Sequence, residues 1–161
     1  MELNPAQTHV EFTLSDVLHT VHGSFQLKRG TVRYDLKAGK CSGEIVIDAQ
    51  SGNSGSEARD KRMHKNILES AKYPEIVFIP DHADGTLSAA NVHGMFTIHG
   101  ASHEMTMTAE ARPSGDGVEL KAHFLVPYVQ WGMKNPSTLF LRVGDTVKID
   151  VDARGAIRSG E

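Results

Sequence analysis

The segment RDKRMHKNILESAKYPEIVF, residues 59–78, interrupts a chain whose apolar residues otherwise alternate with polar ones. The i, i+3, i+4, i+7 spacing of one helix face is present in His64, Ile67, Leu68 and Ala71. Pro74 disfavours the helical region for Tyr73, and the apolar run 76–79 is typical of a buried strand. A single helix among strands must place its apolar stripe against the sheet. We therefore expect this helix to cover one mouth of a closed sheet that encloses an apolar ligand.

The residues before this stripe indicate where the helix begins. Ser54 and Glu57 have the spacing of a capping box, in which two side chains satisfy backbone N–H groups of the first turn. The run SGNSGS, residues 51–56, has the composition of a flexible connector. We predict one helix over about residues 55–71, with the SGNSGS run as its hinge and the helix as a gate.

Short strands separated by turns are predicted for the rest of the chain. Alternation of apolar and polar residues is typical of antiparallel strands with one buried face. Turn residues separate them, for example Arg29-Gly30 and Ala38-Gly39-Lys40. The run 76–79 does not alternate, so we expect that strand to be covered on both faces. Nine or ten strands, which indicate an all-β barrel or sandwich, are predicted at 9–14, 25–27, 32–36, 45–47, 76–79, 92–98, 105–111, 118–126, 139–143 and 147–151.

Composition excludes several classes of protein. The 161 residues suggest one domain, and a net charge of −3 leaves no basic excess for binding nucleic acid. Cys41 is the single cysteine, so no intrachain disulfide can form. No apolar run has membrane-spanning length, so a soluble protein is expected. The first residues lack a signal-peptide pattern, which predicts a cytoplasmic protein, or a periplasmic one if a signal sequence was removed.

Seven short pieces of sequence carry a family resemblance. They are HVEF (9–12), VHGSF (21–25), GTVRYD (30–35), IVID (45–48), RD with His64 (59–64), YPEIVF (73–78) and GMFTIHG (94–100). In these pieces and in their order, the chain resembles the YceI-like family of polyisoprenoid-binding, lipocalin-like proteins. The family commonly has Arg-x-Asp-Phe-Gly near the end of the domain. Residues 128–132 here are YVQWG, without the charged pair.

The resemblance implies an all-β fold, an antiparallel lipocalin-like β-barrel with one inserted α-helix. A single domain would span residues 1–155, followed by a C-terminal tail at 156–161. The resemblance further implies a long isoprenoid or fatty-chain lipid held in an apolar tunnel, without catalysis and with no other cofactor. Members of the family are often dimers and many are periplasmic, so a homodimer is a further expectation.

The predicted ligand-binding residues are mostly aromatic and aliphatic side chains on the inner faces of the predicted elements: Phe12, Leu14, Phe25, Tyr34, Ile67, Phe78, Phe96, Ile98, Leu120, Phe124, Trp131 and Met133. Burial contributes about 0.8 kcal/mol per methylene, against an association cost of roughly 4–15 kcal/mol. A ligand without polar contacts therefore needs a long chain, which the protein would transport or store. The same side chains could also fill the barrel, which would make the protein a solid-cored structural or interaction module.

Histidines and basic residues offer two more interpretations. A metal site needs three or four converging ligands. His19 and His22 are three positions apart, and residues with this spacing on a strand point to opposite faces. We therefore assign no metal or catalytic site, and a His-based metal-dependent enzyme acting on a lipid-like substrate stays as an alternative, with candidates His19, His22, His99 and His103. The helix start is basic, which is typical of a solvated face or of transient contact with an anionic headgroup or membrane, through Arg59, Lys61, Arg62 and Lys65.

Overall fold

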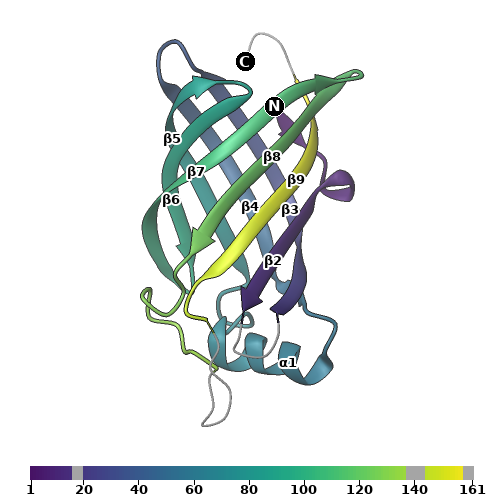
Figure 1. The fold of residues 1–161 in the computed structure, drawn as a ribbon, viewed down its shortest axis with the longest axis vertical. Coiled ribbons are helices and arrows are strands. Elements are labelled where there is room, and N and C mark those ends of the chain that lie inside the picture. Colours follow the sequence, from purple (N-terminus) through teal and green to yellow (C-terminus); the bar gives the residue numbers. More distant parts are fainter. Residues whose placement is uncertain (16–19, 137–143, 158–161) are drawn as a thin grey trace.

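The computed structural model describes residues 1–15, 20–136 and 144–157. Its strands form one antiparallel sheet that closes on itself (Figure 1). The strands are β1 (Glu2–Leu3), β2 (His9–Ser15), β3 (Thr20–Asp35), β4 (Lys40–Asn53), β5 (Glu75–Thr86), β6 (Ala89–Ile98), β7 (Ala101–Ser114), β8 (Gly117–Val126) and β9 (Val147–Ala156). The helical elements are the 3-10 helix η1 (Pro5–Gln7), the α-helix α1 (Glu57–Arg62) and the π-helix η2 (Met63–Ile67).

Strands β2 to β9 form the wall of the barrel. Each pairs antiparallel with the next along the chain, and β9 pairs with β2 to close the sheet. The short β1 pairs with both β3 and β9, where it continues the wall beyond the start of β2. The predicted all-β antiparallel, lipocalin-like barrel is therefore confirmed.

Alternation places one face of each strand inside the barrel. In β2, Val10 and Phe12 are buried whereas His9 and Glu11 are exposed. In β7 the buried side chains are Met105, Met107 and Ala109. The apolar core therefore lies within the closed sheet, as the period-two pattern predicted.

The predicted turn at Arg29-Gly30 is wrong, because both residues lie inside the 16-residue strand β3. Gly30 serves a close approach instead of a turn: a Cβ atom there would lie 2.9 Å from Cδ1 of Leu3. The Ala38-Gly39 turn between β3 and β4 is confirmed, and Gly39 has a φ of 68°, which favours glycine.

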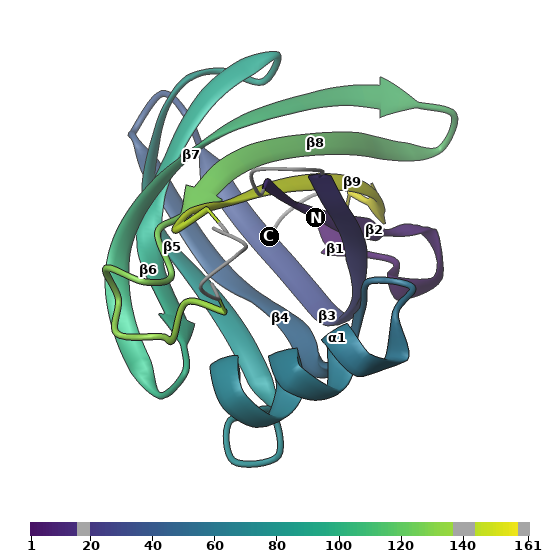
Figure 2. The same ribbon diagram turned by 60° about the horizontal axis from the view of Figure 1, so that its bottom comes forward.

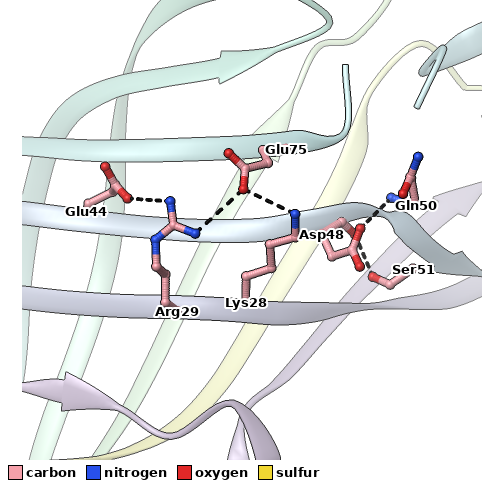
Figure 3. Close-up of polar contacts among 7 residues, drawn as sticks. All are labelled: Lys28, Arg29, Glu44, Asp48, Gln50, Ser51 and Glu75. Carbon is pink, nitrogen blue, oxygen red and sulfur yellow. Dashed lines mark hydrogen bonds and ion pairs between the residues drawn. The ribbon is translucent and has the colours of Figure 1, made fainter. Parts of the chain in front are cut away.

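A β-bulge shapes the outer face of β3. The register of β3 against β4 shifts between Leu27 and Arg29, so the extra residue allows Lys28 and Arg29 both to be exposed. Figure 3 shows both side chains directed toward Glu75 of β5, with Nζ of Lys28 at 3.2 Å and Nη1 of Arg29 at 3.6 Å from its carboxylate. Arg29 also pairs with Glu44. These ion pairs lie outside the barrel, so the interior stays apolar.

The helix is shorter than the predicted 55–71 and begins at a different residue. Ser56, not Ser54, is the N-cap, and its hydroxyl accepts a hydrogen bond from the Arg59 N–H. Ser54 donates both its backbone N–H and its hydroxyl to the Asp60 carboxylate, at 2.8 and 2.6 Å, because an ionised oxygen is the stronger acceptor. The predicted hinge is also shorter, since residues 51–53 belong to β4.

The predicted apolar stripe is broken at its end by the π-helix η2. The N–H of Leu68 bonds to the carbonyl of Met63, five residues earlier, so the helical period lengthens here. Leu68 is buried, but Ala71 falls outside the stripe and is exposed.

Segment 54–73 lies at the end of the barrel opposite the N-terminus, and α1 borders this opening beside the ends of β3 and β4 (Figures 1 and 2). It does not cover the outer face of β5, where Ile79 is 48% exposed. The expectation that this strand is buried on both faces is therefore wrong. The predicted strand 139–143 lies outside the described residues. Among the described residues, no helix has the length and apolar character needed to cross a membrane.

Candidate ligand-binding cavities of the barrel

Two adjoining cavities occupy the inside of the barrel. The helix-side cavity, next to segment 54–73, has a volume of about 410 Å³, and the upper cavity, nearer the N-terminus, has about 130 Å³. A cavity of about 150 Å³ in another protein binds one benzene molecule. By that measure the helix-side cavity would take roughly 16 carbon atoms and the upper cavity roughly five. Both cavities are lined by Val10, Ile47, Ile76, Phe96 and Phe124.

Glycines in the wall make room for the aromatic rings that line the helix-side cavity. The ring of Phe12 lies over Gly23 of the neighbouring strand, where a Cβ atom would be 2.2 Å from Cζ of Phe12. Gly52 likewise faces Phe25, whose ring is 5.4 Å from that of Phe12. Met63 of η2 packs on the same glycine. Gly23 and Gly52 lie within strands, and their lack of a side chain leaves the space that these neighbouring side chains occupy.

Segment 54–73 is fixed to the barrel by the imidazole of His64. Its Nε2 lies 2.8 Å from the carbonyl oxygen of Gly52, and its Nδ1 lies 2.8 Å from the hydroxyl of Ser70. A carbonyl can only accept, so Nε2–H donates to Gly52 and, in the neutral ring, Nδ1 accepts from Ser70. The sequence pattern placed His64 in the apolar stripe and did not reveal this polar role.

Polar side chains at the helix-side cavity come mainly from segment 54–73. Ser54, Ser56, Arg59 and Arg62 line its rim, while the strands contribute apolar side chains. Among the described residues lining this cavity, the two arginines are the only charged ones. No charged side chain lines the upper cavity in the described part of the chain. This cavity includes Cys41, and burial raises the pKa of that thiol, which keeps it neutral.

Eleven of the twelve predicted ligand-binding residues line these cavities, and their contact with a ligand stays a prediction. Phe96 and Phe124 line both cavities; Tyr34, Phe78 and Leu120 line the upper cavity; the helix-side cavity is lined by Phe12, Leu14, Phe25, Ile67, Ile98 and Met133.

Trp131 is the predicted ligand-binding residue that lies outside both cavity linings. Its indole stacks on the ring of His103, with the centroids 4.1 Å apart and the planes 3° apart, and it also contacts Phe96. Nε2 of His103 is buried and has no hydrogen-bond partner among the described residues. His103 covers one face of the Trp131 indole. Trp131 therefore packs against Phe96 and His103 instead of lining a cavity.

Tyr128, at the position where the resemblance led us to expect an arginine, closes the loop after β8. Its hydroxyl donates a 2.6 Å hydrogen bond to the carbonyl of Gly144, and burial raises its pKa to about 12. Its ring also lines the helix-side cavity. The phenol is neutral, so it adds no charge to the lining of this cavity. The residue type alone did not indicate this role.

One group among the described residues has the composition of a metal site, and it lies away from the cavities. Asp81 and His82 of β5 face His93 of β6 because the register shifts between Pro80 and His82. Nδ1 of each histidine approaches the same carboxylate oxygen of Asp81, at 2.5 and 2.9 Å. The two imidazoles are stacked at 4.5 Å and 20°, so both rings would have to turn before one metal ion could lie in both planes.

The other candidate histidines do not assemble into a site in the described part of the chain. His19 lies outside the described residues. His22 is exposed and contacts the hydroxyl of Thr13 at 3.4 Å, whereas His99 bonds to Glu69.

A family model for the YceI-like domain matches residues 1–154. The chain belongs to the YceI-like domain family. No curated protein matches its sequence significantly. Solved structures show the same fold as this YceI-like chain. BcnA from Burkholderia cenocepacia has a TM-score of 0.84 at 17% identity, with 96% of this chain and 99% of that chain covered.

Two further structures resemble this YceI-like chain. A polyisoprenoid-binding domain from Saccharophagus degradans, implicated in plant cell wall breakdown, has a TM-score of 0.74 at 19% identity and covers 97% of this chain and 98% of its own. A YceI protein from Campylobacter jejuni has a TM-score of 0.71 at 15% identity, with 86% of both chains covered. At these identities the likeness establishes the fold of the chain.

Proposed function

We propose that this YceI-like protein binds one long apolar chain, isoprenoid or fatty, lengthwise inside the barrel and without covalent chemistry. The observation that supports this function is the pair of adjoining cavities with apolar walls. A solid-cored module would have filled this volume with side chains, because protein interiors normally contain few voids larger than a water molecule.

The volume sets the length of the chain. Sixteen methylenes buried in the helix-side cavity would contribute about 13 kcal/mol, against roughly 4–15 kcal/mol for association. A chain that also reaches the upper cavity could bury about five more carbons, roughly 20 in all. We therefore expect affinity to rise with chain length up to about that size and then to level off.

The description of the Saccharophagus degradans domain as polyisoprenoid-binding supports an isoprenoid as one class of chain. The test is mass spectrometry of an organic extract of the natively purified protein. One apolar chain per protein molecule is the expected result. Protein that carries no chain lipid, and that shows no saturable binding of any chain length, would contradict the proposal.

Transport or storage requires that the chain enters and leaves, and we propose segment 54–73 as the gate. The hydrogen bond from His64 to the carbonyl of Gly52 holds this segment against β4, and the contact with Ser70 inside the segment orients the imidazole. His64→Ala should therefore speed ligand exchange, whereas Lys65→Ala on the same segment, whose side chain is exposed, should leave it unchanged. Stopped-flow transfer of a fluorescent fatty acid to vesicles measures this rate, and equal rates in both variants would refute the gate.

A metal-dependent enzyme is the alternative of a different class. Asp81, His82 and His93 do not line either cavity, so a metal held there would not face a chain inside the barrel. Non-catalytic binding therefore remains our proposal. A homodimer, transient membrane contact, and a cytoplasmic or periplasmic location stay predictions of the sequence, and sedimentation and fractionation experiments can test them.

A further inference from the structure

The charged side chains at the rim of the helix-side cavity point to the chemistry of the ligand's head. Arg59 and Arg62 stand three residues apart on α1, so they project from one face of the helix. Both line the cavity, and both are exposed, so the rim lies where the apolar interior meets water.

Neither guanidinium has an ion-pair or side-chain hydrogen-bond partner in the described part of the chain. Two arginines on the barrel wall are paired, Arg29 with Glu44 and Glu75, and Arg112 with Glu119. The exposed Arg33 of β3 also has no such partner among the described residues, but it lines neither cavity. The acid between the two rim arginines, Asp60, is occupied by the N–H and hydroxyl of Ser54. Two unpaired cations therefore border an apolar cavity in a protein whose net charge is −3.

A guanidinium matches a carboxylate or a phosphate, because its planar fork donates two parallel hydrogen bonds. An anionic head cannot enter the apolar interior without a large desolvation cost, whereas at the rim it stays hydrated and meets both arginines. Building on the proposed function, we propose that the ligand is a single-chain amphiphile with an anionic head, a carboxylate or a phosphate. It lies tail-first in the barrel with its head at Arg59 and Arg62.

The same helical segment supplies a matched control. Lys61 and Lys65 are exposed cations close to the two arginines, but they do not line the cavity. An effect of general positive charge would be shared by all four side chains. Recognition of a bound head requires the two arginines alone.

The experiment measures dissociation constants of dodecanoate, dodecyl phosphate and dodecanol by displacement of a fluorescent fatty acid. Wild type, the Arg59→Gln/Arg62→Gln variant and the Lys61→Gln/Lys65→Gln variant are compared after thermal unfolding shows that all three are folded. We expect wild type and the lysine variant to bind the anionic chains about tenfold more tightly than dodecanol, which corresponds to about 1.4 kcal/mol. In the arginine variant this preference should disappear, with dodecanol binding unchanged.

Each other outcome overturns the proposal in a recognisable way. Equal affinity of wild type for dodecanoate and dodecanol would remove the head interaction but keep the chain-binding function. Absence of binding for every chain would remove both. Saturable binding of inorganic phosphate, as tight as that of dodecyl phosphate, would indicate a site for the free anion. Equal loss of binding to anionic phospholipid vesicles in both double variants, with the chain preference intact, would indicate a membrane-docking surface instead.

Discussion

Oε2 of Glu69 and Nε2 of His99 are hydrogen-bonded to each other, and both residues have left-handed backbones, with φ values of 48° and 55°. They are the two non-glycine residues with positive φ in the described part of the chain. Glu69 follows η2, and His99 lies in the turn between β6 and β7. This contact therefore fastens the end of segment 54–73 to the barrel wall, beside the ring of Tyr73, which packs edge-on against His99.

The Glu69–His99 contact should make stability depend on pH. The hydrogen bond with His99 holds the pKa of Glu69 below its usual value of 4.5, with Lys72 and Lys134 contributing in the same direction. A lowered pKa in the folded state gives stability that is present above the ordinary pKa and lost as the pH falls through the lowered one. Glu69→Gln should therefore lower Tm at about pH 7, and the difference from wild type should shrink as the pH falls below the ordinary pKa of glutamate.

Thermal unfolding monitored by circular dichroism across this pH range measures the effect. Glu57→Gln is the matched control, because Glu57 is exposed and has no side-chain partner in the described structure. If the Tm difference between Glu69→Gln and wild type stayed constant as the pH fell below about 4, ionisation of Glu69 would not contribute to stability.

The left-handed backbones give a second prediction at the same residues. An L side chain in this region costs roughly 1–2 kcal/mol, a cost that glycine does not have. Both Glu69→Gly and Glu69→Ala lose the hydrogen bond, but only the glycine variant relieves the backbone. Urea unfolding should therefore show Glu69→Gly to be about 1 kcal/mol more stable than Glu69→Ala, with the same order at His99. The reverse order would show that neither backbone is strained.

Gly23→Ala should destabilise the barrel and disturb the helix-side cavity. The added methyl would lie 2.2 Å from Cζ of Phe12 and 2.7 Å from the carbonyl oxygen of Asn53, so the ring must move. Overpacking of this kind costs about 1–3 kcal/mol of unfolding free energy. Phe12→Leu should recover part of this loss in a double-mutant cycle. Gly115→Ala, where a Cβ meets nothing within 4 Å, controls for loss of glycine although its φ of 59° adds strain.

Filling the upper cavity should shorten the chain that the protein accepts. Ala109 lines this cavity and is buried, so Ala109→Phe would occupy much of its 130 Å³. Affinity for chains of about 20 carbons should then fall to that of chains of about 16, while shorter chains bind as before. Ala89→Phe, at an exposed position of β6, is the control. Unchanged dependence on chain length would mean that the tail does not reach the upper cavity.

Trp131→Ala should lower stability with little effect on chain binding. Trp131 packs on His103 and Phe96 but does not line either cavity. Truncation of this half-buried ring should cost about 2 kcal/mol, with chain affinity changed by less than about twofold. Met133→Ala, at a residue that does line the helix-side cavity, should weaken binding instead. If Trp131→Ala lost much affinity and Met133→Ala did not, Trp131 would be shown to contact the bound chain.

The inner faces of the strands could be predicted because alternation depends only on local sequence. The alternation of apolar and polar residues was enough to place Phe12, Phe96 and Phe124 correctly inside the barrel. The same local reasoning failed at Gly30, because the need for glycine there comes from Leu3, a residue 27 positions away in the sequence. The position of Trp131 likewise depends on a partner, His103, that no spacing rule identifies.

The helix was located correctly but its details were not. Ser54 and Ser56 are both reasonable N-caps, and the choice between them is made by Asp60, which binds Ser54. The π-helix η2 then shifts the period, so Ala71 leaves the stripe that the sequence predicted. Whether the interior is hollow was also open, because the volumes of Gly94 and Ala109 have meaning only once the radius of the barrel is known.

The pairing of β9 with β2 leaves the barrel wall without a free sheet edge among the described strands. An edge strand is what allows a second chain to add by main-chain hydrogen bonds, and the described strands offer no such edge for β-augmentation. Through these strands, two copies would meet by side chains on the outer wall instead of by main-chain hydrogen bonds. Ile79 and Met95, exposed apolar partners on β5 and β6, supply the kind of surface that such a contact would use.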